Sequence, residues 1–255
     1  MISFIDGYYG WLGNQMFQFA ATKALALHRG TEASFPQNRP NLHQVFRLDA
    51  LPKLKYQAAP ARYTEPHFHY DPVFWDQPDN TELQGYFQSA RYFSRWSTQI
   101  REAFALVEPA DGRWVPDGGW EGNEWVSHER VSIHVRRGDY LNLKDHHPPL
   151  GMDYYRAAMD LFPGERFVVF SDDTGWCREN FDARLCEFAE GTAVEDLERM
   201  THCSNHIIAN SSFSWWGAWL GKNPDKKVVA PKRWFGPAKA GWDTKDLLPE
   251  EWIKC

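Results

Sequence analysis

The sequence has no run of about 18 uninterrupted apolar residues, the length that a helix needs to cross a bilayer. Its first five residues, followed by Asp6 and Gly7, have neither the basic start nor the apolar core of a signal peptide. The four cysteines form no C-x-x-C pair and have no spacing typical of a zinc site. We therefore expect a reduced, cytoplasmic protein without a transmembrane segment.

The chain also lacks an excess of positive charge. It has 28 Lys and Arg residues against 34 Asp and Glu residues, a formal net charge of −6 and a pI near 5.9. Proteins that bind duplex nucleic acid normally carry a basic face, so nucleic acid is not expected as a partner. Internal repeats and low-complexity tracts are absent, and the hydrophobic (43%) and charged (24%) fractions are ordinary for a folded globular chain.

Aromatic residues are what the sequence has in excess. They make up 16% of the chain and include 13 Trp. Trp suits a protein core, but its ring also stacks on sugar faces and nucleobases. The excess therefore points to a carbohydrate or nucleotide ligand.

The second half of the chain alternates short apolar strands with amphipathic helices. Strands are predicted at residues 131–135, 167–170, 206–209 and 228–230, and helices at 152–162, 195–203 and 213–220. This alternation predicts an α/β fold with a parallel sheet. Such sheets bind ligands at the carboxyl ends of their strands.

The first half opens in the same way, with a strand at residues 1–5, a glycine-containing loop and a helix at 14–28. The alternation then breaks down over residues 31–95, and residues 108–123 are rich in Pro and Gly, as in a linker. We therefore predict two domains, 1–122 on the acceptor side and 123–255 on the donor side, with a C-terminal tail that can cross back.

Residues 134–140 (HVRRGDY) bring charge to the end of a buried strand. Because successive strand residues point to opposite faces, His134 and Arg136 should share one face and Arg137 should take the other. The planar fork of Arg suits a diphosphate because it donates two parallel hydrogen bonds and never loses its charge. The alternative is a surface salt-bridge cluster in which Arg137 pairs with Asp139.

Two other segments place strand-to-helix turns where anions can bind. In residues 10–18 (GWLGNQMFQ) the loop runs into a helix N-terminus, although Asn14 alone is simply a good N-cap. In residues 209–219 (ANSSFSWWGAW) the hydroxyls of Ser211 and Ser212 can hold phosphate oxygens, and the alternative is a Ser N-cap on a core helix.

The acidic positions have similar alternatives. Asp172 and Asp173 form either a metal-binding pair or a helix cap with a solvated charge. Asp196 either complements a helix dipole or accepts two hydrogen bonds from the edge of a guanine. The adjacent His146 and His147 have no partner at helical spacing and predict no metal site.

Four segments in order along the chain resemble the family-11 inverting fucosyltransferases, bacterial α-1,2-fucosyltransferases that use GDP-fucose. They are residues 12–20 (LGNQMFQFA), 134–140, 170–173 (FSDD) and 210–220 (NSSFSWWGAWL). Residues 31–125 match no segment of the family. The family usually has two glycines where this chain has Gly10 and Trp11, so the loop should be more restricted or should pack differently beside the donor.

The resemblance implies a GT-B-like fold, in which two Rossmann-like domains face each other and the C-terminal one holds the donor. It implies transfer from GDP-fucose to the 2-hydroxyl of a galactose-terminated oligosaccharide without a metal or other cofactor. A lipid-linked acceptor would bring the enzyme to the inner face of the membrane. The implied donor-binding residues are Gly13, Asn14, Gln15, Arg136, Asp196, Ser211, Ser212 and Phe213.

We predict catalytic roles for Arg136, Asp139 and His134. Asp139 is the nearest candidate for the base, although it could instead hold an arginine by a salt bridge or yield the role to a carboxylate from residues 31–95. Two alternative functions stay open: the same architecture with another nucleotide sugar or acceptor hydroxyl, and a Trp-rich carbohydrate-binding protein without catalysis.

Overall fold

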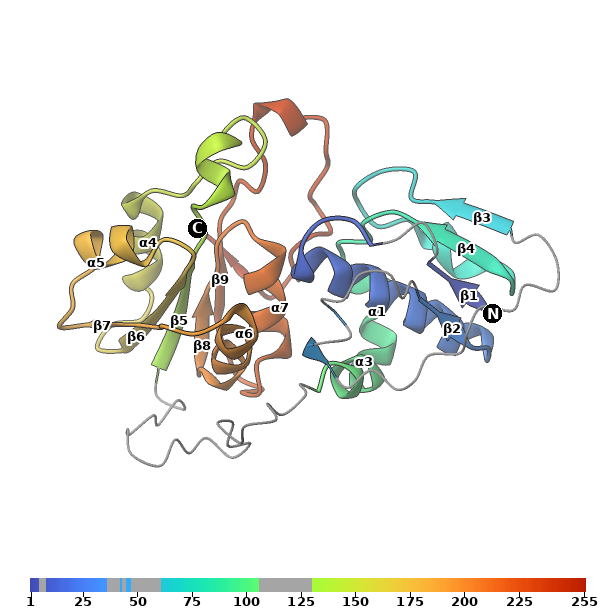
Figure 1. Cartoon of the computed structure of the whole chain (residues 1–255), viewed down its shortest axis with the longest axis horizontal. Helices are drawn as coiled ribbons and strands as arrows, with labels where there is room; N and C mark the ends of the chain where they lie inside the picture. The colour runs from blue at the N-terminus through green and yellow to red at the C-terminus, as the bar shows by residue number, and fades with distance from the viewer. Residues whose placement is uncertain (5–7, 36–41, 43–44, 47–60, 106–129) are drawn as a thin grey trace. The chain divides into compact units, whose positions relative to one another are not determined.

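The computed structural model describes residues 1–4, 8–35, 42, 45–46, 61–105 and 130–255, and its elements are labelled in Figure 1. The chain forms two compact units. Unit 1 comprises Met1–Val107 and Trp242–Pro249, and unit 2 comprises Glu108–Gly241 and Glu250–Cys255. The predicted linker and the predicted boundary between residues 122 and 123 lie outside the described residues.

Unit 1 contains a four-stranded parallel sheet with the strand order β2-β1-β4-β3. The strands are β1 (Ile2–Ser3), β2 (Ala33–Ser34), β3 (Ala61–Thr64) and β4 (Thr81–Gln84). Parallel neighbours need a crossover, and helix α1 (Leu12–Arg29) supplies it between β1 and β2. Helix α3 (Ser97–Ala103) packs against α1.

The start of α1 differs from the sequence prediction. Asn14 was predicted as the N-cap, but Trp11 occupies that position and Asn14 lies in the first turn of the helix. Gly10 has a φ of +68°, and a Cβ at this position would come 2.2 Å from the Asn14 side-chain nitrogen. The turn before α1 therefore favours glycine at position 10. The helix ends at Gly30, whose left-handed conformation (φ of 64°) lets its N–H bond the carbonyl of Leu27.

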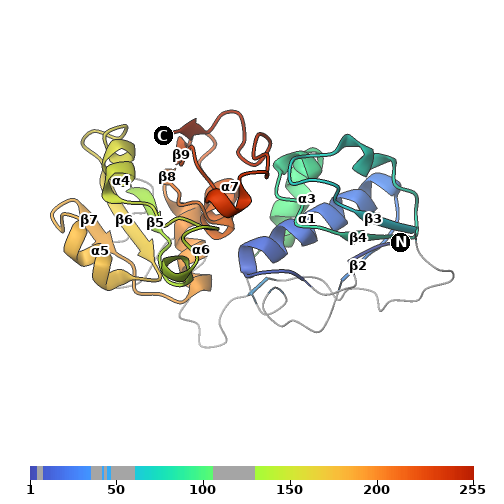
Figure 2. The same cartoon turned by 90° about the horizontal axis from the view of Figure 1, so that it is seen from above.

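Unit 2 contains a six-stranded sheet in the order β10-β9-β8-β5-β6-β7, with every neighbouring pair parallel (Figure 2). The strands are β5 (Arg130–Val135), β6 (Arg166–Ser171), β7 (Cys186–Phe188), β8 (Asn205–Ile207), β9 (Val228–Ala230) and β10 (Ile253–Lys254). The order runs outward in opposite directions from β5 and β8. The reversal between these two strands is a topological switch point, the place where open α/β sheets bind ligands.

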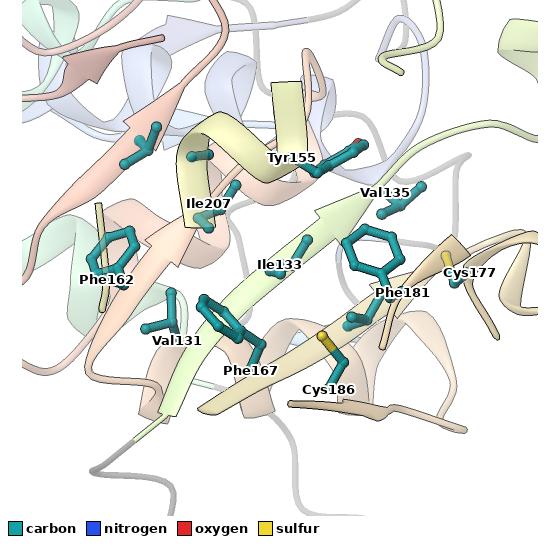
Figure 3. Close-up of a cluster of buried hydrophobic side chains, with 13 residues drawn as sticks. Val131, Ile133, Val135, Tyr155, Phe162, Phe167, Cys177, Phe181, Cys186 and Ile207 are labelled. Atoms are coloured by element: carbon teal, nitrogen blue, oxygen red, sulfur yellow. The ribbon is translucent and has the colours of Figure 1, made fainter. Parts of the chain in front are cut away.

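Helices cover both faces of this sheet. They are α4 (Met152–Met159), α5 (Thr174–Asn180), α6 (Ala193–His202) and α7 (Ser212–Leu220). On one face, Ile133 of β5 packs in a cluster with Tyr155 of α4 and Cys177 of α5 (Figure 3). On the other face, Phe170 of β6 packs with Met200 of α6. Alternate strand residues thus feed two cores, as the period of two requires.

The strands and helices predicted for the second half are confirmed, with ends that shift by a few residues. One α-helix and two strands of unit 2 have no counterpart in the predictions: α5, β7 and β10. Across the described ranges, no helix combines the length and the apolar character needed to cross a membrane.

Candidate functional site in unit 2

The two strands at the switch point deliver the two motifs singled out in the second half. Residues 136–140 follow β5, and residues 208–212 follow β8, its parallel neighbour. The phenol of Tyr140 donates a hydrogen bond of 3.0 Å to the backbone carbonyl of Asn210. The structure therefore joins the arginine motif and the serine turn into one cluster at the carboxyl edge of the sheet.

Arg136 is held between two carboxylates. Its Nη2 lies 2.7 Å from Asp139 Oδ1, and its Nη1 lies 2.9 Å from Asp172 Oδ2. The guanidinium carbon is 5.5 Å from the ring centroid of Tyr140. A guanidinium has five N–H donors, so these two pairs orient the fork and use only part of its donor capacity. Asp139 thus holds an arginine by a salt bridge, but that arginine is Arg136 and not Arg137, the partner named in the alternative interpretation.

Arg137 points to the other side of the strand and is anchored there. Its Nε donates to Asp173 Oδ2 at 2.9 Å, and its guanidinium lies 4.2 Å from the ring centroid of Trp176 in α5. Its backbone N–H donates to Asp172 Oδ1 at 2.9 Å. The hydrogen bond from Arg137 holds the pKa of Asp173 below its usual value. Arg137 thus ties the end of β5 to the start of α5.

The carboxylates of Asp172 and Asp173 are both engaged by arginine. Asp173 also caps α5, because its Oδ1 accepts the N–H of Trp176 at 3.1 Å. In the part of the chain that the structure describes, no group of three or more Asp, Glu, His or Cys side chains could hold a metal ion. Asp173 is thus the helix cap of the alternative interpretation, whereas Asp172 is ion-paired with Arg136 and is not a solvated charge.

His134 lies on the face opposite Arg137, as predicted. Its ring is buried and lies 5.4 Å from that of Phe213 at the start of α7. Burial lowers the pKa of His134 to about 3, so the imidazole is neutral at pH 7. Its Nδ1 is buried and has no hydrogen-bond partner among the described residues. A neutral imidazole with so low a pKa is a weak proton acceptor, which leaves it better suited to hydrogen bonding than to base catalysis.

The serine turn presents the N-terminus of α7. Ser211 occupies the N-cap position, as the alternative interpretation expected. Its side chain, however, makes no capping hydrogen bond. The turn is instead fixed by Asn210, whose side-chain nitrogen donates to the carbonyls of Pro148 and Trp234, both at 3.0 Å. Ser212 is the first residue of the helix, where backbone N–H groups and the dipole favour an anion.

Asp196 lies in the first turn of α6, where the cap is already complete. Thr192 and Glu195 form a capping box, in which the Thr192 N–H donates to the Glu195 carboxylate at 2.7 Å. Burial raises the pKa of Asp196 to about 6, and its Oδ1 is buried without a hydrogen-bond partner among the described residues. A Cβ at Gly191 would come 2.7 Å from that oxygen. A carboxylate that only complemented a helix dipole would not need this buried setting.

Gly13, Asn14 and Gln15 belong to α1 in unit 1. The Asn14 carboxamide oxygen accepts a 2.7 Å hydrogen bond from Gln88, and the Gln15 side chain donates to the carbonyl of Gly10 at 3.0 Å. These contacts fix the loop before α1. The neighbouring Trp11 adopts an extended backbone, which any residue can take, and is 70% exposed.

His147 and Lys239 lie behind Tyr140, the ring next to Arg136, and the sequence did not predict this arrangement. The ring of His147 stacks on Tyr140 with 4.9 Å between centroids, and its Nε2 lies 3.1 Å from Lys239 Nζ. Burial lowers the pKa of His147 to about 4 and also lowers that of Lys239. The paired histidines at 146–147 were considered only as metal ligands, and nothing in the local sequence pointed to a contact with a lysine 92 residues away.

Comparison with known proteins places this geometry in context. Residues 7–254 match the family described as Glycosyl transferase family 11. The chain is 30% identical over 287 aligned positions to the alpha-1,2-colitosyltransferase of Escherichia coli, covering 96% of each protein. It is 32% identical over 279 positions to galactoside alpha-(1,2)-fucosyltransferase 1 of Bos taurus, covering 94% of this chain and 76% of that one.

Among solved structures, the chain is similar to FUT1 of Arabidopsis thaliana in complex with GDP. The TM-score is 0.54 with 11% identity, over 99% of this chain and 75% of that one. At this identity the likeness concerns the fold. Together with the two parallel-sheet units, it confirms the predicted GT-B-like α/β fold.

Proposed function

This chain belongs to glycosyl transferase family 11, and we propose that it transfers L-fucose from GDP-β-L-fucose to the 2-hydroxyl of a terminal galactose, with inversion. The observation that carries the proposal is the oriented fork of Arg136 beside the N-terminus of α7, both at the switch point of unit 2. This is where a diphosphate is expected in such a fold. The α-1,2 linkage is supported by the names of the relatives from Escherichia coli and Bos taurus.

The proposed chemistry needs a stabiliser for the departing phosphate. As the bond from fucose C1 to the β-phosphate oxygen breaks, the sugar gains oxocarbenium character and negative charge grows on the phosphate. Arg136 would donate its fork to that charge, and Ser211, Ser212 and the first N–H groups of α7 would donate hydrogen bonds. The guanidinium of Arg136 and the backbone N–H groups at the start of α7 are positioned by the fold, so they would need little reorganisation to stabilise the transition state.

Asp139 is proposed as the base that removes the proton from the galactose 2-hydroxyl. In the structure its Oδ1 lies 2.7 Å from the Arg136 fork. Because this contact occupies the carboxylate oxygen, the proton-accepting role requires that the donor diphosphate take over part of the contact with Arg136. His134, neutral and buried, is proposed to orient the donor by a hydrogen bond rather than to accept the proton.

Transfer is expected to persist in excess EDTA, and added Mg²⁺ or Mn²⁺ should change the rate little. The motivation is that Asp172 and Asp173 are each ion-paired with an arginine, while Arg136 and the helix N-terminus can take the role of a cation. Rates are compared after dialysis against chelator and after each metal is returned. Complete loss with EDTA, reversed by Mn²⁺, would restore the two carboxylates as metal ligands.

Release of GDP from GDP-fucose, measured with and without lactose, tests the proposed reaction. Release should be slow without lactose and strongly accelerated by it.

A second candidate function is the transfer of colitose, because the relative from Escherichia coli is named a colitosyltransferase. A colitose donor outcompeting GDP-fucose would favour that candidate, and no release with any galactoside and either donor would favour a non-catalytic carbohydrate-binding protein.

A further inference from the structure

Unit 1 carries a row of aromatic rings at one edge of its sheet. Because β1, β4 and β3 are parallel, the residues that follow them emerge at the same, carboxyl edge. Tyr9 follows β1, Tyr86 follows β4 and Phe68 follows β3, while Trp242 comes from the segment that returns to unit 1. We call these four residues the aromatic row.

The rings of the aromatic row contact one another in sequence. Tyr9 and Tyr86 have centroids 5.8 Å apart, and Tyr86 and Trp242 have centroids 6.4 Å apart. Trp242 and Phe68 are stacked, with centroids 4.9 Å apart and an interplanar angle of 23°. Trp242 is 38% exposed and the other three are half-buried, so the row is a surface rather than a core.

The backbone behind the aromatic row is fixed. The carboxylate of Glu65 accepts the N–H of Tyr86 at 2.8 Å and that of Phe87 at 3.1 Å. The Gln18 side chain clasps Tyr9, accepting its N–H at 2.9 Å and donating to its carbonyl at 3.1 Å. A ligand that stacks on these rings would therefore bind a surface that is already ordered, which lowers the entropic cost of binding.

Polar groups lie at the Phe68 end of the row. The rings of His67 and His69 stack with centroids 3.5 Å apart, and His69 Nδ1 lies 3.6 Å from Asp243 Oδ2. Flat apolar rings with hydrogen-bonding groups at one end match a pyranose, which has an apolar C–H face and a rim of hydroxyls. Galactose fits this description well, because its axial 4-hydroxyl leaves the C–H bonds at C3, C4 and C5 on one face.

We propose that the aromatic row binds a pyranose ring of the acceptor, with Trp242 as the main stacking surface and the groups at the Phe68 end bonding its hydroxyls. This inference rests on the proposed function for the identity of the sugar. It assigns acceptor binding to residues outside the motifs that carry the donor chemistry. It also gives a role to the segment Trp242–Pro249, which leaves unit 2 and returns to unit 1 before the chain ends.

The test uses Trp242→Ala and Trp242→Phe in the full-length protein. The Ala variant should raise the KM for lactose at least about 10-fold, whereas Phe, which keeps an aromatic face, should raise it less. The KM for GDP-fucose should stay within about twofold in both, because Trp242 is not among the predicted donor-binding residues. A lactose KM that the Ala variant leaves unchanged would overturn the proposal. An equal loss for donor and acceptor would also overturn it, because it would mean that Trp242 is structural.

Trp75→Ala is the matched control. Trp75 lies in the short 3₁₀ helix Pro72–Asp76 of unit 1 and is half-buried. Its ring packs against His28 in the last turn of α1, with centroids 5.0 Å apart. Because α1 crosses back over the sheet, this end of the helix lies away from the carboxyl edge. The control should leave the KM for lactose unchanged.

A binding measurement separates this proposal from the proposed function. Saturation-transfer NMR with methyl β-galactoside, in the absence of any donor, should show contact with the wild-type protein and a clearly weaker signal with Trp242→Ala. If no transfer occurs with any donor but this binding is found, the proposed reaction is wrong and the sugar-binding role of the aromatic row is supported. If transfer occurs but Trp242→Ala binds the galactoside as tightly as the wild type does, the sugar-binding role of the aromatic row is wrong and the proposed reaction is supported.

Discussion

Replacing Arg136 with lysine is expected to lower turnover nearly as much as replacing it with alanine, by about 10²–10³-fold. In the structure, two different terminal nitrogens of Arg136 contact Asp139 and Asp172. Lysine keeps the charge but has a single nitrogen, so it cannot span both carboxylates and also offer two parallel donors to a diphosphate.

The measurement is kcat at saturating GDP-fucose and lactose, with melting temperature as a check on folding. Arg184→Lys is the matched control, because Arg184 is exposed and pairs only locally with Asp182. It should retain full turnover. An Arg136→Lys enzyme with half of the wild-type turnover would show that Arg136 supplies only bulk charge or a structural contact.

Asp196→Asn is expected to weaken binding of GDP-fucose at least about 10-fold, which corresponds to about 1.4 kcal/mol. A carboxylate can accept from the N1–H and N2–H₂ groups of guanine together, whereas asparagine would set a donor against a donor. The buried, unbonded Oδ1 of Asp196 is the structural reason to expect this contact. Glu195→Gln is the matched control, because it also removes one negative charge from the first turn of α6 and its amide oxygen can keep the capping box. It should leave the affinity for GDP-fucose unchanged.

The same contact predicts a pH dependence. Because burial raises the pKa of Asp196 to about 6, the carboxylate that accepts from guanine is progressively lost below that pH. Affinity for GDP-fucose should therefore fall as the pH drops through about 6 in the wild type and stay flat in Asp196→Asn. GDP-fucose is the better ligand here than GDP, since its diphosphate carries no terminal ionisation in this range.

Stability gives an independent check with the opposite sign. The carboxyl of Asp196 has a pKa of 3.8 in its ordinary state and of about 6 in the folded protein. The free energy of unfolding therefore falls as the pH rises from about 3.8 to about 6, because the unfolded chain ionises first. Asp196→Asn removes that ionisation, so the melting temperature near neutral pH should not fall. If Asp196 only complemented the dipole of α6, the substitution would lower the melting temperature and leave binding unchanged, and calorimetric titration at pH 7.5 separates the two cases.

Strands that lie in an apolar run of the sequence were predictable, and strands outside such runs were not. β5 reads RVSIHV, in which buried Val and Ile recur, and β9 reads VVA. β3 and β4 of unit 1 read ARYT and TELQ, which have no apolar pattern. They become strands because they pair with each other and because β4 also pairs with β1. The two-residue β10 exists only through its pairing with β9.

The candidate site divides in the same way. That the arginine motif and the serine turn meet could be predicted, because both follow strands of one parallel sheet. Which carboxylate pairs with which arginine could not be predicted. Arg136 pairs with Asp172, 36 residues away, and Arg137 pairs with Asp173 and not with the nearby Asp139. Such pairings depend on the turn after β5 and on the position of α5, for which the sequence offered only a possible cap at Asp172 or Asp173.

NMR of the product formed from GDP-β-L-fucose and lactose tests the proposed reaction most directly. We expect a single new fucose residue with an α-anomeric signal and a through-bond correlation from its C1 proton to C2 of galactose. That result would establish the sugar, the hydroxyl and the inversion in one spectrum. A β-anomeric product, or attachment to any other hydroxyl of lactose, would contradict it.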